Sequence, residues 1–527
     1  MEKGYLALVL HAHLPFVRHP EHEESLEENW LYEAMTESYI PILLVLDNLL
    51  KEDIDFRLTL SITPTLSSML IDPFLCSRYL KRLEKLIELG EKEIKRTRSE
   101  PAFNALAIMY RNRLLHIRSV FLDRYEKDLI RAFKRLQDLG KVEIIAGAAT
   151  HGYLPLLLNE SSIRAQIQIG MEHCERLFGI RPQGFWLPEC GYHTGIERFL
   201  KEQGIRYTIL ETHGITRASP KPKYGIYAPI FSTSGVAFFG RDPESSKQVW
   251  SSIEGYPGDH DYREFYRDIA YDLELDYIKP YIPSGIRIDT GFKYFRITNK
   301  TDYKEIYDPL SAKKKAEIHA GNFMFNREKE IEYLSLIMDR KPIVVAPYDA
   351  ELFGHWWFEG PLWLDYLIRK VCSEQRTFSL ITLSEYLREY PVNQVSNPSS
   401  SSWGFKGFHE TWFNGDCDWI YRHLHQGAIY MENLAKNYSR AKGLTLRALK
   451  QASRELLLAE SSDWPFMISR RTTKEYAIRR VKTHLLRLLR LKKEIEEGQI
   501  DERYLLALEG QNNIFPEIDY RVFCQTP

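Results

Sequence analysis

Histidines and carboxylates recur where short apolar runs of this sequence end. The run YLALVLHAHLP (5–15) contains a histidine pair, and the run GFWLPECGY (184–192) carries a carboxylate near its end. Residues of these types at such ends are His11, His13, His151, Glu189, Glu211, His213, Asp242, Asp349 and Glu351. A charge at the end of a buried strand is costly unless it emerges into a polar site. In a parallel barrel the carboxyl ends of the strands meet on one face, so these residues define one candidate site.

Two chemistries can use this set of side chains. In the first, two carboxylates flank a glycosidic bond, one as nucleophile and one as acid/base, while histidines hold sugar hydroxyls. In the second, the H-x-H pair His11 and His13, further histidines and an aspartate bind a divalent metal that activates water. An extended chain points both members of H-x-H to the same side, which suits either chemistry, so the spacing alone leaves both open.

Aromatic residues crowd the same run ends and favour the first chemistry. Aromatic side chains offer large apolar faces for stacking on sugar rings, and they make up 13% of this chain. The rings that we expect to contact a sugar are Trp186, Tyr192, Trp356, Trp357, Trp403, Trp412 and Trp419. Packing in the core is the alternative role for each of them, and the pair at 356–357 suits packing as well as sugar contact.

The elements that must position these residues are β-rich runs separated by helical sequence. The runs occupy 5–15, 56–66, 142–155, 184–192, 206–214, 236–244 and 342–355, with a weaker one at 378–387. Apolar strands separated by helices indicate parallel strands covered on both faces. Seven or eight such units predict an α/β fold with a closed barrel of the TIM type. An open doubly wound sheet is the alternative, but no glycine-rich phosphate loop follows the first strand.

The sequence divides into a barrel and several additions. We predict the barrel at 1–390, with a helical insertion at 67–141, where two charged amphipathic patterns follow each other. The stretch 245–335 is rich in Tyr, Asp, Gly and Pro and predicts long loops over the barrel mouth. A Ser- and Trp-rich linker at 391–420 is expected to contribute to the site, and a C-terminal helical domain follows at 421–527.

The composition argues against several kinds of partner. In this 527-residue chain, 71 Lys and Arg balance 72 Asp and Glu, so the net charge of −1 indicates neither a nucleic acid nor an anionic membrane as partner. Six cysteines without a CxxC pair predict neither a disulfide framework nor a thiolate zinc site. No apolar run is long enough for a signal peptide or a membrane span, so we expect a cytoplasmic protein.

Five segments together resemble the sequence regions of glycoside hydrolase family 57. They are HAHLP, GAATHGYLP, WLPECGY, APYDAELFGHWW and the Trp-rich segment 403–419, and they occur in the family's order between residues 11 and 419. Five ordered motifs are far more specific than any one of them. The helical C-terminus, with SSDWPF at 461–466, also resembles members of the α-glucan branching-enzyme type.

The resemblance implies a fold, an activity and roles for particular residues. The fold is a distorted (β/α)7 TIM-like barrel, and the reaction is a retaining one on α-1,4-glucans such as starch, glycogen and maltooligosaccharides, with no catalytic metal or other cofactor. By position, Glu189 matches the family's nucleophile and Asp349 its acid/base. The residues that match its substrate contacts are His11, His13, His151, Trp403 and Trp412.

We therefore expect a 1,4-α-glucan branching enzyme. The stretch between Glu189 and Asp349 is short for that type, which carries an acceptor-screening loop there, so we also expect substantial hydrolysis. An α-amylase or a 4-α-glucanotransferase of the same family is the alternative, and a metal-dependent hydrolase or deacetylase on a TIM-like barrel is a more distant one. A glucan-binding protein without turnover is the non-enzyme alternative, and the sequence sets no oligomeric state.

Three further residues near the two carboxylates have less certain roles. Glu351 lies two positions after Asp349 on the same strand face, so it competes for the acid/base role. Glu211 and His213 have no clear counterpart in the family, and we expect them to support the site or the fold.

Overall fold

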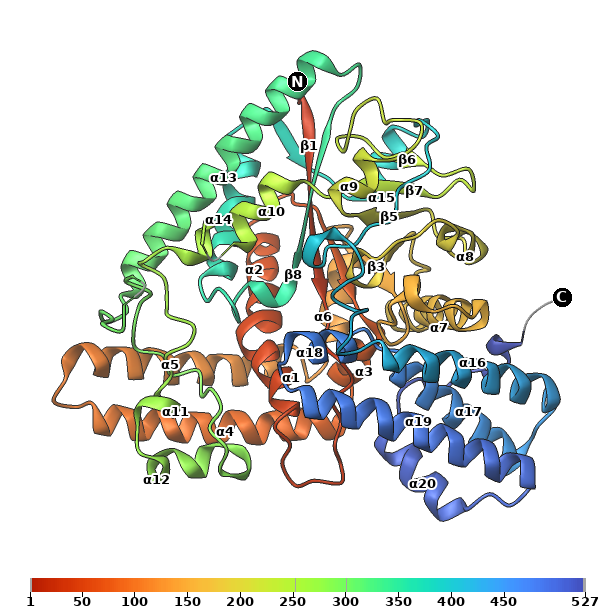
Figure 1. Cartoon of the computed structure of the whole chain (residues 1–527). Helices are drawn as coiled ribbons and strands as arrows, with labels where there is room; N and C mark the ends of the chain where they lie inside the picture. The colour runs from red at the N-terminus through yellow and green to blue at the C-terminus, as the bar shows by residue number, and fades with distance from the viewer. Residues whose placement is uncertain (1, 252, 300, 525–527) are drawn as a thin grey trace.

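The computed structural model describes residues 2–251, 253–299 and 301–524, and its centre is one curled sheet of mostly parallel strands (Figure 1). The parallel strands are β1 (Gly4–Ala12), β2 (Leu58–Ile62), β3 (Val142–Gly147), β4 (Gly184–Trp186), β5 (Tyr207–Leu210), β7 (Ala237–Gly240) and β8 (Ile343–Asp349). They lie in the order β7-β5-β4-β3-β2-β1-β8, and the short β6 (Ile230–Phe231) pairs with β7 in the antiparallel direction. Each of these strands overlaps a predicted run, and because they are parallel their carboxyl ends share one edge.

The sheet curls without closing. The backbone N–H of Asp242, just after β7, donates to the carbonyl of Val345 in β8 at 2.9 Å, but no ladder joins these two strands in the described part of the chain. The weak eighth run forms β9 (Phe378–Leu380), which pairs with the first residues of β1. The α/β TIM-like fold class is confirmed, whereas the closed barrel is corrected to a curled half-barrel, because the eighth strand lies beside β1 and not between β7 and β8.

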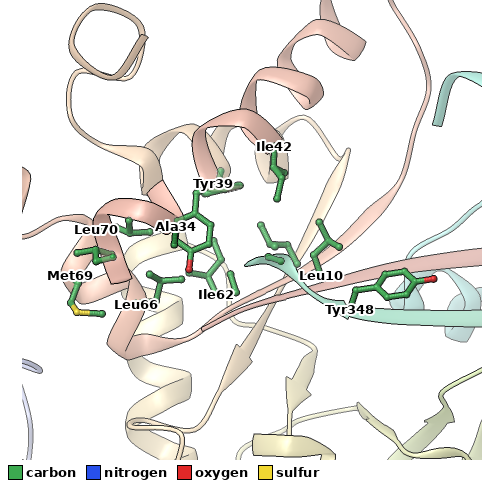
Figure 2. Close-up of a cluster of buried hydrophobic side chains, with 14 of the residues drawn as sticks. Leu10, Ala34, Tyr39, Ile42, Ile62, Leu66, Met69, Leu70 and Tyr348 are labelled. Atoms are coloured by element: carbon green, nitrogen blue, oxygen red, sulfur yellow. The ribbon is translucent and has the colours of Figure 1, made fainter. Parts of the chain in front are cut away.

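Alternate side chains of β1 enter two different cores. Tyr5, Ala7 and Val9 pack inside the curl with residues of β4, β5, β7 and β8, among them Trp186. Leu6, Leu8 and Leu10 point the other way and pack under the surrounding helices. Figure 2 shows part of this outer core, where Leu10 lies near side chains of the helical segment 34–42. Burial on both faces explains why the strands read as continuous apolar runs.

Helices cover the outer face of the curl. They are α1 (Glu28–Ala34), α2 (Ile40–Lys51), α3 (Pro64–Leu70), α6 (Leu129–Asp138), α7 (Glu160–Phe178), α8 (Ile196–Glu202), α9 (Thr212–Thr216), α10 (Pro243–Trp250) and α14 (Gly360–Ser373). The helix α15 (Leu383–Glu389) instead packs on the inner core, where Tyr386 contacts Tyr5. The long helices α4 (Pro73–Arg96) and α5 (Pro101–Ser119) pack on each other and project from the sheet (Figure 1). Both lie within the segment that we predict as an insertion.

The prediction of loops over 245–335 is wrong for its last third. Residues Pro309–Ile337 form α13, a helix of 29 residues that packs against α14. Asp308 caps its start by accepting a hydrogen bond from the N–H of Leu310, and a proline follows in the first turn, where its missing N–H costs nothing. Before it, α11 (Ile269–Asp272) and α12 (Leu275–Ile278) interrupt a largely irregular stretch.

The C-terminal region is helical and lies at the strand-end edge of the sheet (Figure 1). Its helices are α16 (Trp419–Asn437), α17 (Gly443–Ala459), α18 (Asp463–Arg470), α19 (Lys474–Glu497) and α20 (Glu502–Gln511). The turn before α18 is joined to the end of β3, because the N–H of Ser462 donates to the carbonyl of His151 at 3.0 Å. Within the described ranges, no helix combines the length and apolar character needed to cross a bilayer.

Candidate active site

The ends of β4 and β8 place Glu189 and Asp349 on one cavity. Glu189 follows β4 by three residues, and Asp349 is the last residue of β8. Both line a cavity of about 320 Å³. Its further lining residues are Arg241, Trp250, Pro347, Tyr348, Trp403, Gly404, Phe405, Thr411, Trp412, Asp463, Phe466 and Arg470. Two carboxylates on one cavity can act together on a bound molecule.

The Glu189 side chain is oriented by hydrogen-bond donors. The backbone turns sharply there, with a positive φ of 60°, a strained conformation for a residue with a side chain. Trp403 Nε1 donates to Oε2 at 2.8 Å, and Ser462 Oγ donates to Oε1 at 3.2 Å. Burial raises the pKa of Glu189, and the hydrogen bonds from Trp403 and Ser462 oppose that rise. These donors bind the ionised carboxylate better than the neutral acid.

Asp349 has a strongly raised pKa. Burial and the neighbouring carboxylates Glu351 and Glu189 raise the pKa of Asp349 to about 8, against smaller opposing effects of Arg241 and His13. At neutral pH its carboxyl group is therefore mostly protonated and is able to give up a proton. Two carboxylates whose environments separate their protonation states are suited to the roles of general acid and nucleophile.

The three predicted histidines form one stack beside Glu189. The rings of His13 and His151 lie 3.7 Å apart between centroids and are inclined by 18°, and His11 stacks on Trp186 at 4.4 Å. His11 Nε2 lies 3.2 Å from His151 Nε2, and His151 Nδ1 lies 2.8 Å from Ser462 Oγ. Burial lowers the pKa values of His11 and His151 well below the ordinary value, so both rings are neutral.

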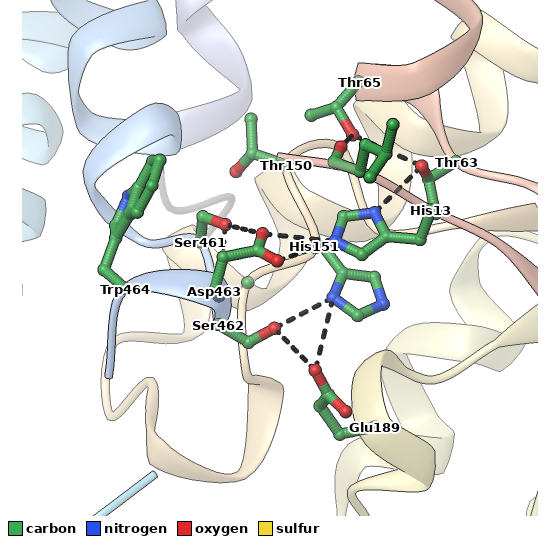
Figure 3. Close-up of polar contacts among 12 residues, drawn as sticks. His13, Thr63, Thr65, Thr150, His151, Glu189, Ser461, Ser462, Asp463 and Trp464 are labelled. Carbon is green, nitrogen blue, oxygen red and sulfur yellow. Dashed lines mark hydrogen bonds and ion pairs between the residues drawn. The ribbon is translucent and has the colours of Figure 1, made fainter. Parts of the chain in front are cut away.

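His13 differs from the other two histidines because it has an acidic partner. Its Nε2 lies 3.1 Å from both carboxylate oxygens of Asp463, and its Nδ1 lies 3.0 Å from Thr63 Oγ1 (Figure 3). Burial lowers the pKa of His13, but Asp463, Glu189 and Glu351 outweigh that effect and raise it above the ordinary value. An imidazolium at this position balances the acidic groups of the site.

His13, His151 and Asp463 also lie close enough together to hold a metal ion. The lone pairs of an imidazole lie in the plane of its ring, so the lone pairs of two stacked rings run parallel and do not converge on one point. The stacking of His13 on His151 therefore suits a hydrogen-bonded network better than a tetrahedral ligand set. This geometry favours the carboxylate chemistry over the metal-dependent alternative.

Several predicted sugar contacts are buried instead. Trp186, Tyr192 and Trp357 are at most 1% exposed, so none of them offers a free face for stacking on a sugar ring. Trp186 packs on His11, Tyr192 donates to Glu197, and Trp357 packs on Phe353, Tyr262 and Trp363. The prediction that these three bind substrate is therefore corrected: they support the site and the core.

Of the other predicted rings, two line the cavity and two lie outside it. Trp403 and Trp412 line the cavity, although Trp412 is almost fully buried against Tyr153. Trp356 is 55% exposed and stacks on Phe265, away from the residues that line the cavity. Trp419, at the start of α16, also lies outside the cavity lining.

The remaining strand-end residues form hydrogen bonds and ion pairs with other parts of the fold. Glu351 accepts hydrogen bonds from the Tyr39 hydroxyl and from the backbone N–H of His13. Glu211 caps α9 and pairs with Arg241 at 3.0 Å. The ring of His213 contacts the carbonyl of Gly407, and Asp242 caps α10 and pairs with the buried Arg327. Of the acidic residues at strand ends, Asp349 and Glu189 are the ones that line the cavity.

Sequence reasoning missed several residues that reach the cavity, most of them from outside the strand ends. These are Arg241, Trp250, Phe405, Phe466, Arg470, Asp463 and, through Glu189, Ser462. Ser462 and Asp463 belong to the SSDWPF segment, which the resemblance singles out, but no sequence spacing ties that segment to Glu189. Trp250 ends α10 and is 52% exposed, so its ring has a free face. That exposure depends on the neighbouring elements and cannot be read from the sequence.

A curled sheet that carries a carboxylate pair and aromatic rings at its carboxyl edge suits an enzyme that cleaves glycosidic bonds. The sequence pattern described as "Glycosyl hydrolase family 57" matches residues 7–398. The chain belongs to this family. A second pattern, "1,4-alpha-glucan branching enzyme, C-terminal", matches residues 423–523.

Relatives cover nearly the whole chain. The 1,4-alpha-glucan branching enzyme TK1436 of Thermococcus kodakarensis is 35% identical over 97% of this chain and 77% of its own length. The solved structure of the alpha-amylase AmyC from Thermotoga maritima is 44% identical, with a TM-score of 0.93 and 100% coverage of both chains. The GH57-type branching enzyme from Pyrococcus horikoshii is 34% identical, with a TM-score of 0.90 over 100% of this chain and 97% of its own.

Proposed function

We propose that the protein is a 1,4-α-glucan branching enzyme with substantial hydrolytic activity. The observation that carries the chemistry is the pair Glu189 and Asp349, which face one cavity: burial and neighbouring carboxylates raise the pKa of Asp349 to about 8, and Glu189 accepts hydrogen bonds from Trp403 and Ser462. The observation that favours branching is the match of residues 423–523 to the C-terminal region of branching enzymes. The same segment supplies Ser462 and Asp463 to the site.

The first half of the reaction breaks the α-1,4 bond. The Asp349 carboxyl group gives its proton to the glycosidic oxygen, which leaves as the 4-hydroxyl of the departing chain. The Glu189 carboxylate attacks the anomeric carbon from the opposite face, so one C–O bond breaks while a glycosyl ester bond forms. A pKa of about 8 for Asp349 keeps the proton available at neutral pH.

The second half transfers the chain. The Asp349 carboxylate, now ionised, takes a proton from the 6-hydroxyl of a second glucan while that oxygen attacks the anomeric carbon. The bond to Glu189 breaks, its carboxylate is regenerated, and an α-1,6 linkage with retained configuration results. When water takes the place of the 6-hydroxyl, the same step gives hydrolysis.

The cavity walls suit a carbohydrate chain. Trp250, Phe405 and Phe466 line the cavity with exposed rings, and such faces stack on the apolar faces of glucose units. Arg241 lies over the Trp403 ring at 5.5 Å and completes a polar wall for hydroxyl groups. We propose starch, glycogen and maltooligosaccharides as substrates on these grounds, and a cytoplasmic location because all six cysteines carry free thiols.

Predominant hydrolysis is the second candidate function. The observation that favours it is the similarity to AmyC, which is 44% identical, whereas the branching enzymes TK1436 and that of Pyrococcus horikoshii are 35% and 34% identical. The two activities share every step up to the glycosyl ester, so the acceptor that reaches the ester decides between them.

One experiment separates these activities. Amylose is incubated with the protein, and proton NMR counts α-1,6 linkages against new reducing ends. A majority of α-1,6 linkages identifies a branching enzyme, and a majority of reducing ends identifies an amylase. New α-1,4 chain lengths with neither product identify a 4-α-glucanotransferase.

Two controls address the remaining alternatives. A chelator that abolishes activity, combined with a nearly silent Glu189→Gln substitution, would establish a metal-dependent hydrolase. Glucan affinity that survives Glu189→Ala, without any product from the unchanged protein, would establish a binding protein.

A further inference from the structure

A continuous chain of hydrogen bonds ends on Glu189. It begins at Ser61 in β2, whose Oγ lies 3.0 Å from His11 Nδ1. It continues through the 3.2 Å contact of His11 Nε2 with His151 Nε2. It then runs from His151 Nδ1 to Ser462 Oγ at 2.8 Å and from Ser462 Oγ to Glu189 Oε1 at 3.2 Å, as Figure 3 shows for its last part.

The direction of every proton in this chain follows from its last member. An ionised Glu189 only accepts, so the Ser462 hydroxyl donates to it and must accept from His151 Nδ1–H. A neutral His151 then has a bare Nε2, which accepts from His11 Nε2–H, and a neutral His11 has a bare Nδ1, which accepts from Ser61. All four hydrogen bonds therefore point toward the carboxylate and polarise one another.

Ser462 is held firmly at its place in the chain. Its side chain is fully buried, and its backbone N–H donates to the carbonyl of His151 at 3.0 Å. The preceding residue, Ser461, forms an antiparallel bridge with Gly152. The C-terminal segment is thus joined to the same strand end that carries His151, so the Ser462 hydroxyl has little freedom to turn away from Glu189.

We propose that Ser462 is a positioning residue for Glu189: as the last donor of this chain, it orients the carboxylate and stabilises its ionised form. The inference rests on the proposed role of Glu189 as nucleophile. It extends that role by assigning a function in the reaction to the C-terminal helices, which would complete the active site and not merely cover it.

Other ionisable groups also act on Glu189 and must stay unchanged in a test. On its own strand end lies Cys190, and from the neighbouring elements come His13, His151, Tyr153, Arg241, Asp349 and Asp463. A substitution that removes only the Ser462 hydroxyl leaves all of these in place. A shift in the titration of the nucleophile can then be traced to that hydroxyl.

The test is the pH dependence of kcat/KM on amylose for Ser462→Ala. Losing a hydrogen bond to a charged group should lower kcat about 10- to 100-fold with little change in KM. Because the lost donor favoured the ionised form, the acid limb should move up by about one pH unit. Ser462→Thr, which keeps a hydroxyl, should restore most of kcat and the position of the acid limb.

Two further variants make the outcome decisive. Ser453→Ala removes another buried serine hydroxyl of the same helical region, one that donates to the carbonyl of Leu449, and should leave the acid limb in place. Ser61→Ala, at the far end of the hydrogen-bond chain, should shift the acid limb in the same direction by less than about half a pH unit. If Ser462→Ala does not fold, the acid limb of Ser61→Ala is the measurement that tests the proposal.

An unmoved acid limb in Ser462→Ala, or in Ser61→Ala where only that variant folds, would overturn the inference. An equal shift in Ser453→Ala would also overturn it, because a general loosening of the helical region would then explain the effect. If the unchanged protein forms no α-1,6 linkages, reducing ends or new chain lengths from amylose, the proposed function fails, and the inference falls with it.

Discussion

Two carboxylates in one cavity differ in this protein because their immediate neighbours differ. Glu189 receives hydrogen bonds from Trp403 and Ser462, which favour its charge. Asp349 is buried beside Glu351 and Glu189, which disfavour a further negative charge. Hydrogen-bond donors therefore favour the charged form of Glu189, whereas the surroundings of Asp349 favour its protonated form.

The acid form can be tested through the alkaline side of the pH profile. Because burial and neighbouring carboxylates raise the pKa of Asp349 to about 8, activity should fall as the pH rises through about 8, where the proton is lost. Asp349→Asn should lower kcat about 10²- to 10⁴-fold and remove that alkaline limb. Glu351→Gln removes a charge that raises the pKa of Asp349, so it should keep the alkaline limb but move it to lower pH. Should it remove the limb while Asp349→Asn keeps it, the acid/base role belongs to Glu351.

Exposed and buried tryptophan rings should respond differently to substitution. Trp250→Ala, at the cavity rim, should raise KM for amylose about three- to tenfold, because one stacking face is lost. Trp357→Ala should instead leave KM nearly unchanged and destabilise the fold by about 3–5 kcal/mol, because the ring is buried. Steady-state kinetics and denaturant unfolding distinguish the two effects. A raised KM in Trp357→Ala would contradict its assignment to the core.

Strand ends and the turns after them are the elements that build the site. His151 and Glu189, which follow β3 and β4, both have positive φ values, 59° and 60°. Such conformations are strained for residues with a side chain, and they persist where packing enforces them. Each turn thereby directs a functional group into the mouth of the curl instead of continuing along the strand.

The turn after β8 depends on a glycine. Gly354 has a φ of 113°, and a Cβ atom there would lie 1.7 Å from the carbonyl oxygen of Glu37. Gly354→Ala should therefore destabilise the protein by about 3 kcal/mol, because both the strain and the clash fall on backbone. Gly415→Ala, where a Cβ meets open space, is the matched control. Equal unfolding midpoints for the two variants would rule out this close approach.

At the scale of the whole molecule, the C-terminal helices and the curled sheet share one polar interface. Asp463 contacts His13, Ser462 contacts Glu189 and His151, and Arg480 donates to the carbonyl of Phe16. These contacts join residues that are hundreds of positions apart in sequence. Catalytic geometry and the docking of the helices therefore depend on the same bonds.

The pair of His13 and Asp463 predicts how stability changes with pH. The pKa of His13 is raised in the folded protein, so the stabilisation is complete below its ordinary value near 6.5. It is lost as the pH rises through the raised value. Asp463→Asn should cost about 3 kcal/mol at pH 6, and the difference from the unchanged protein should shrink at higher pH.

Denaturant unfolding at several pH values, followed by tryptophan fluorescence, tests this pair. Asp416→Asn removes a more exposed carboxylate that pairs with Lys474 at 3.3 Å on the same helical region, and it should change stability by less than about 1 kcal/mol. A cost for Asp463→Asn that is constant with pH would show that the charge of His13 does not contribute.

Periodicity and residue type were enough to predict the strands and the position of the two carboxylates. Apolar runs such as 5–15 and 342–355 report burial on both faces, and parallel strands bring their carboxyl ends to one edge whatever the loops do. The roles of single rings were not predictable in the same way. Trp186 and Trp357 have the same side chain as Trp403, and only packing decides which ring has a free face.

The α/β class, the family and the strand-end residues can be predicted from the amino-acid sequence, because they depend on local patterns and ordered motifs. The open sheet between β7 and β8, the helix at 309–337 and the contact of Ser462 with Glu189 became visible in the folded chain. The physical reason is that a hydrogen bond between residues 273 positions apart leaves no trace in spacing or periodicity. It exists only where the packing of whole elements brings the two atoms together.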